Sequence, residues 1–228
     1  MGLVGRLFIV CLVAFACGAC TQVYNVPSST PGDAALITRY TVALVEDGDH
    51  VYCSGEWVSE DTILTANHCD PEDEIGAFVS YATRDDVVRD GEKFAAVHTA
   101  TIVKRDSEHD LLLLRATRVS LHPYARVGAD PFVGDAVQTM GHPLGLWWSY
   151  STGVIAAVRR VDVGDDAIDP DMVWTQSTAP ISPGNSGGGL YTVAGELVGI
   201  CSRGLRSGQN LNLYVSARYV RAFLASAA

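Results

Sequence analysis

The residue of this sequence best placed to do chemistry is Ser186, which lies in the run Pro183-Gly184-Asn185-Ser186-Gly187-Gly188-Gly189. A serine acts as a nucleophile when its hydroxyl is exposed on a tight turn and nearby backbone N–H groups can receive a negatively charged oxygen. Glycines on both sides permit the backbone geometry that such a turn requires. Ser186 is therefore a candidate nucleophile for acyl transfer, although the pattern Gly-x-Ser-x-Gly alone is not specific.

The positions of the histidines restrict which kind of enzyme could use this serine. In α/β-hydrolases the catalytic histidine follows the serine along the chain. Here every histidine precedes Ser186, and the six are His50, His68, His98, His109, His122 and His142. This order excludes the α/β-hydrolase interpretation and leaves the order His, Asp, Ser open.

Two short segments supply the other candidate residues. The first is Thr62-Ile63-Leu64-Thr65-Ala66-Asn67-His68-Cys69, and the second is His109-Asp110-Leu111-Leu112-Leu113-Leu114. They resemble the segments of trypsin-like serine peptidases in which a strand ends in Thr-Ala-Ala-His-Cys and an aspartate directly precedes an apolar strand. The resemblance implies a catalytic triad of His68, Asp110 and Ser186. Asp106 is a rival to Asp110, but no apolar strand follows it directly.

The resemblance extends over roughly residues 37–224 and is strongest to the bacterial HtrA-like branch. The motifs that carry it are Gly141-His142-Pro143-Leu144-Gly145-Leu146, Gln176-Ser177-Thr178-Ala179-Pro180 and Glu196-Leu197-Val198-Gly199-Ile200. Asn67 and Gly189 depart from the usual pattern, and we expect no PDZ domain after the peptidase domain. The resemblance further implies an oxyanion hole made by the N–H groups of Gly184 and Ser186, and a disulfide between Cys53 and Cys69.

The resemblance to trypsin-like peptidases also implies a substrate pocket formed by six residues. They are Pro180, Cys201, Ser202, Arg203, Gly204 and Asn212. Pro180 occupies the position that is acidic in trypsin, and Asn212 replaces a pocket glycine. We therefore expect a preference for a small or medium apolar residue before the scissile bond. Cys201 has no partner once Cys53 and Cys69 are paired, so we expect a free thiol on the pocket wall.

The remaining chain predicts an all-β fold. Short apolar runs separated by Gly, Asp and Pro are typical of antiparallel sandwiches or barrels, and they are 40–45, 62–66, 111–114, 136–140, 153–158 and 197–201. A helical period is kept only over 217–225. The resemblance implies that this fold consists of two six-stranded antiparallel β-barrel lobes, over about 34–122 and 131–216, followed by a short C-terminal helix. The polar stretch 122–130 is the expected seam between them.

The first residues predict export. Residues 7–16 are an apolar run, too short to span a bilayer and typical of a signal peptide. It ends at Cys17-Gly18-Ala19-Cys20, which resembles a bacterial lipoprotein signal with Cys20 as the lipidated residue. We expect a signal over 1–19, a tether over 20–33 and the peptidase domain over 34–228. An ordinary cleaved signal is the alternative.

These observations predict an exported serine endopeptidase, periplasmic or at the cell surface and anchored to the membrane by lipid. Its partners would be protein or peptide substrates, and it needs no cofactor or metal. A net charge of −10 argues against nucleic acid as a partner. The alternative from another class is a catalytically silent binding module on the same fold, but such a module usually lacks a triad residue.

Overall fold

The computed structural model describes residues 33–47, 50–70, 75–88, 93–94, 97–117, 122–205 and 208–227. The expected signal peptide, Cys20 and all of the expected tether except Asp33 lie outside these residues. Neither α-helix in the described part of the chain has the length and apolar character needed to cross a membrane.

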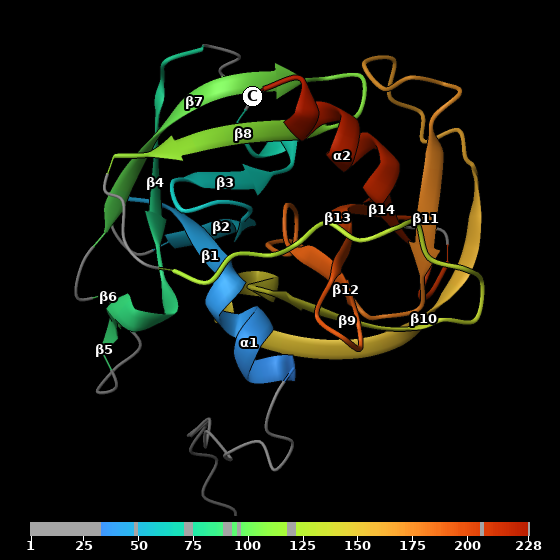
Figure 1. Ribbon diagram of the computed structural model, residues 1–228, viewed down its shortest axis with the longest axis horizontal. Coiled ribbons are helices and arrows are strands. Elements are labelled where there is room, and N and C mark those ends of the chain that lie inside the picture. Colours follow the sequence, from blue (N-terminus) through green and yellow to red (C-terminus); the bar gives the residue numbers. More distant parts are fainter. Residues whose placement is uncertain are drawn as a thin grey trace, which may run out of the picture.

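Two closed six-stranded antiparallel barrels form the body of the molecule, side by side in Figure 1. The first barrel has the strand order β1-β2-β3-β8-β7-β4 and the second has the order β10-β11-β14-β13-β12-β9. The strands of the first are β1 (Thr41–Glu46), β2 (His50–Trp57), β3 (Thr62–Thr65), β4 (Phe78–Ala82), β7 (His98–Asp106) and β8 (Leu111–Ala116). Those of the second are β9 (Ala136–Gly141), β10 (Ser149–Arg160), β11 (Val173–Ser177), β12 (Gly189–Thr192), β13 (Leu197–Gly204) and β14 (Asn212–Ser216).

The predicted fold class is confirmed, because the chain forms two closed six-stranded antiparallel barrels followed by a short helix. The C-terminal helix α2 (Ala217–Ala225) has the predicted bounds, with Val220 and Phe223 buried. The smaller elements are β5 (Val87–Val88) with β6 (Lys93–Phe94), and the 3₁₀ turns η1 (Asn67–Cys69), η2 (Arg84–Asp86) and η3 (Pro143–Gly145).

A helix that the sequence did not predict precedes the first barrel. This is α1 (Asp33–Tyr40), so the strand expected from Tyr40 begins one residue later, at Thr41. The helix is short and only weakly periodic, and it buries Ile37 and Tyr40 in a core cluster to which both barrels contribute. Tertiary contact rather than local propensity therefore stabilises it.

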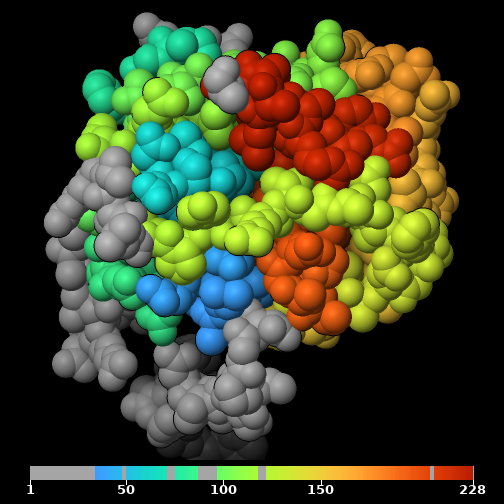
Figure 2. Space-filling view, viewed as in Figure 1, coloured from blue at the N-terminus to red at the C-terminus, as the bar shows by residue number. Residues whose placement is uncertain are grey.

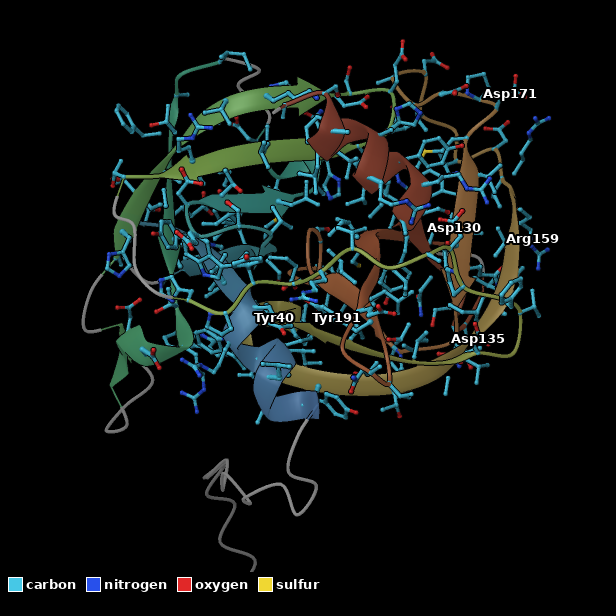
Figure 3. All side chains as sticks on the ribbon, viewed as in Figure 1. Tyr40, Asp130, Asp135, Arg159, Asp171 and Tyr191 are labelled. Carbon is cyan, nitrogen blue, oxygen red and sulfur yellow. A yellow bond between two sulfur atoms is a disulfide. The ribbon has the colours of Figure 1, made fainter. Side chains whose placement is uncertain are left out.

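The segment between the barrels, residues 122–135, makes backbone contacts with both of them. The backbone N–H of Ala125 donates to Trp57 of the first barrel, and Val127 forms a bridge with Leu197 of the second. In the space-filling view this segment crosses the face of the molecule next to α2 (Figure 2). Asp130, labelled in Figure 3, is paired with Arg218 of α2. The segment thus contacts both barrels and α2, which restrains the barrels relative to each other.

Candidate active site

The three predicted triad residues come from both barrels and are brought together by strand ends. His68 lies in η1, directly after β3, and Asp110 directly precedes β8. Strands β3 and β8 are paired, so the two residues are neighbours at one end of the first barrel. Ser186 reaches them from the second barrel, on the turn before β12.

The side chains form a continuous line of hydrogen bonds. His68 Nε2 is 2.8 Å from Ser186 Oγ. His68 Nδ1 is 2.9 Å from Asp110 Oδ2, and the backbone N–H of His68 donates to Oδ1 at 3.0 Å. Asp106 instead pairs with His109, and the described structure gives it no contact with His68. The geometry thus joins Asp110, and not its rival, to the imidazole.

Asp110 is placed to remain charged although it is 2% exposed. Burial by itself would raise the pKa of Asp110, but the hydrogen bonds and positive charge of His68, with a hydrogen bond from Ser202, lower it below its usual value. Ser202 Oγ donates to Oδ2 at 2.5 Å. A charged Asp110 accepts the Nδ1 proton of His68, which leaves Nε2 free to accept the proton of Ser186 Oγ.

The nucleophile turn depends on two glycines. Gly184 and Gly187 have φ values of +99° and +82°, and a Cβ on them would overlap the carbonyl oxygens of His142 and Ser54 respectively. The carbonyl of Ser186 accepts a hydrogen bond from the backbone of Ser54 at 2.8 Å. Within the described chain, the N–H groups of Gly184 and Ser186 donate no hydrogen bond, so both are free to donate to an oxyanion.

A disulfide restrains the segment that carries His68. Cys53 of β2 is bonded to Cys69, the residue after His68, across a sequence separation of 16. It closes the chain around β3 and so restrains η1 against the barrel. Cys201 is a free cysteine and is 1% exposed.

The predicted pocket residues lie on neighbouring segments. Gly204 of β13 is opposite Asn212 of β14, and Asn212 Nδ2 donates to the carbonyl of Ala179, next to Pro180, at 2.7 Å. The guanidinium of Arg203 donates a hydrogen bond from Nη1 to Asp165 Oδ2 at 3.1 Å. The side chain of Cys201 does not face solvent and lies in a buried cluster with Leu190, Val198 and Tyr214. Burial also raises the pKa of its thiol well above the ordinary value.

Sequence reasoning missed a buried glutamate behind the nucleophile turn. Glu56 of β2 is fully buried and accepts the N–H of Gly189 at 2.6 Å and the hydroxyl proton of Tyr191. Burial raises the pKa of Glu56 to about 8, and its hydrogen bonds offset this only in part. Figure 3 shows Tyr191 beside Tyr40 at the end of α1, with ring centroids 6.1 Å apart. The one signal in the sequence was a charged residue between Gly55 and Trp57 in a predominantly buried strand.

Known proteins resemble this chain in sequence. The family model described as a trypsin-like peptidase domain matches residues 53–200. The serine endoprotease DegS of Haemophilus influenzae is 38% identical over 105 residues, which are 46% of this chain and 30% of that protein. The chain spans less than a third of the length of this and the other curated relatives first found.

Solved structures agree with the fold. A serine endoprotease from Yersinia pestis has a TM-score of 0.65 at 21% identity, covering 87% of this chain and 67% of that one. The HtrA-type protease AlgW, solved with a decapeptide, has a TM-score of 0.64 at 25% identity, covering 77% of this chain and 50% of that one. Since the family model spans more than half of the sequence and includes His68, Asp110 and Ser186, the chain belongs to the trypsin-like peptidase family.

Proposed function

We propose that the protein is a serine endopeptidase that hydrolyses peptide bonds through an acyl-enzyme. The observation that carries this proposal is the line of hydrogen bonds from Asp110 through His68 to Ser186. Beside it, the N–H groups of Gly184 and Ser186 make no hydrogen bond to any described residue. Its relatives are named as serine endoproteases, which supports the same reaction class.

We propose the following role for each group. His68 Nε2 takes the proton of Ser186 as Oγ attacks the carbonyl carbon of the scissile peptide bond. The N–H groups of Gly184 and Ser186 receive the oxyanion of the tetrahedral intermediate. His68 then gives its proton to the leaving amine, and a water molecule releases the acyl group in the same way. Asp110 stays ionised and holds the imidazole in the tautomer that this needs.

Ser186→Ala tests the proposal, with Ser182→Ala as its matched control. Ser182 is an exposed serine four residues earlier in the same loop. The wild type and Ser182→Ala should react with a fluorophosphonate probe and cleave members of a peptide library, whereas Ser186→Ala should do neither. Peptide binding without cleavage or labelling by the wild type would instead indicate the silent binding module.

The pocket should prefer small or medium apolar residues before the scissile bond. Asn212 is fixed by its bond to Ala179, and the guanidinium of Arg203 carries positive charge at the neighbouring position of β13. A basic substrate side chain would be buried there without an acidic partner, which is costly. Enrichment of Arg or Lys at this position of the cleaved library would contradict the proposal.

We also propose that the chain is exported and held at a membrane. Relatives named as periplasmic endoproteases support export, and the Cys17-Gly18-Ala19-Cys20 motif supports lipidation of Cys20. Residues 1–19 would be the signal, 20–33 the tether and 34–228 the peptidase domain. Cys20→Ser should move the protein from the membrane fraction to the soluble fraction, whereas retention in the membrane fraction would point to another anchor.

A further inference from the structure

A buried histidine contacts the nucleophile turn from behind, outside the triad. His142 follows β9, is fully buried and packs edge-on against Trp148 with ring centroids 4.7 Å apart. Its Nδ1 is 2.9 Å from Ser54 Oγ, and Ser54 Oγ in turn donates to the carbonyl of Gly184 at 2.8 Å. A buried histidine is thus connected to the residue that supplies one N–H of the oxyanion hole.

The direction of these hydrogen bonds follows from counting protons. The hydroxyl of Ser54 has one proton, which it gives to Gly184, so it must accept the other bond from His142 Nδ1–H. The ring therefore carries its proton on Nδ1, and Nε2 has no partner among the described residues. Burial lowers the pKa of His142 to about 3, so the ring stays neutral and the direction is the same at any working pH.

The segment that follows His142 also contacts the peptide bond between Pro183 and Gly184. The N–H of Leu144 donates to the carbonyl of Pro183 at 2.7 Å. In a trans peptide the carbonyl and the N–H point in opposite directions, so fixing the Pro183 carbonyl directs the N–H of Gly184 away from Leu144. Residues 142–144 thus restrain the carbonyls on both sides of Gly184, one directly and one through Ser54.

We propose that His142 is a positioning residue, which through Ser54 keeps the Gly184 turn in the conformation that presents its N–H to the oxyanion. Glycine at φ +99° can change conformation at little steric cost, so the turn needs restraint from outside. A rotated Gly184 would lose its donor from the oxyanion hole, although Ser186 and His68 would remain in contact.

Two substitutions of nearly the same shape test this. His142→Asn keeps an N–H donor near the position of Nδ1, and His142→Leu keeps the bulk without a donor. Removing one oxyanion donor costs on the order of 10²–10³ in kcat, so displacing it in His142→Leu should lower kcat roughly 10- to 100-fold with KM changed less than about twofold. His142→Asn should stay within about threefold of the wild type, and Ser54→Ala should resemble His142→Leu.

This inference rests on the proposed endopeptidase activity, so a second measurement is independent of turnover. NMR of ¹⁵N-histidine-labelled protein should show His142 as the neutral Nδ1-protonated tautomer, with the Nδ1–H signal shifted in Ser54→Ala. A proton on Nε2 would overturn the inference even in an inactive protein. A wild type that cleaves no peptide would refute the proposed function, whereas an active wild type with equal kcat in His142→Leu would refute the role of His142 alone.

Discussion

Replacing Glu56 with glutamine should change how stability depends on pH. Below its unfolded pKa of 4.5 the carboxyl is neutral in both states, and folding carries no penalty for charge. Because the folded pKa is raised to about 8, the unfolded state loses its proton first as the pH rises. The unfolded state then binds fewer protons, so stability falls with rising pH between these two values, by about 1.4 kcal/mol per pH unit.

From pH 5 to pH 7.5 this group should remove roughly 3 kcal/mol from the free energy of unfolding of the wild type. Glutamine does not titrate, so Glu56→Gln lacks this loss. At pH 5 the variant should be less stable than the wild type by about 1–3 kcal/mol, because its amide nitrogen cannot accept from Gly189 or Tyr191. By pH 7.5 that difference should have disappeared or reversed.

Urea unfolding at both pH values measures the effect, since the midpoint multiplied by the slope gives the free energy. Glu60→Gln is the matched control, because it removes one carboxylate from an exposed position four residues away. The other titrating groups are common to wild type and variant and cancel in the difference. A gap between wild type and Glu56→Gln that is the same at both pH values, within about 0.5 kcal/mol, would refute the reasoning.

Three further changes follow from the site. Asp110→Asn should fold normally and lower kcat by about 10⁴, because the amide no longer selects the working tautomer of the imidazole; a loss below tenfold in steady-state kinetics would contradict this. Replacing Cys53 and Cys69 together by serine should lower the free energy of unfolding by about 3 kcal/mol and Tm by about 6–12 °C, and a calorimetric shift under 2 °C would be too small. Gly187→Ala should abolish activity and lower Tm, since its Cβ would overlap the carbonyl of Ser54; a variant with wild-type turnover would disprove the steric argument.

The sequence was most informative where function depends on short segments. His68 follows one apolar strand and Asp110 precedes another, so local patterns indicated both as candidates, and the glycines around Ser186 indicated its turn. The two-barrel fold followed from the resemblance that these segments carry. The pattern of short apolar runs supported it independently, because each run lies largely within a strand.

Contacts between distant residues could not be read in this way. The buried carboxylate of Glu56 is bonded to Gly189 and Tyr191, which lie 133 and 135 residues further along the chain. Nothing near a lone glutamate in a strand indicates such partners. Helix α1 is similar, because it is stabilised by the core into which Ile37 packs. Cys201 was expected on a pocket wall, and the alternation of β13 alone could not show how deeply its side chain is buried.

The division of the triad between two barrels has a consequence for how the protein matures. His68 and Asp110 belong to the first barrel and Ser186 to the second, so neither barrel alone joins a nucleophile to its base. Closing each barrel also pairs strands from distant parts of the chain, which makes such folds slow to form. The line of hydrogen bonds from Asp110 through His68 to Ser186 can therefore form only when the two barrels are docked. Under the proposed function, a chain that is still folding would not cleave the unfolded segments of its neighbours, because its nucleophile and its base are not yet joined.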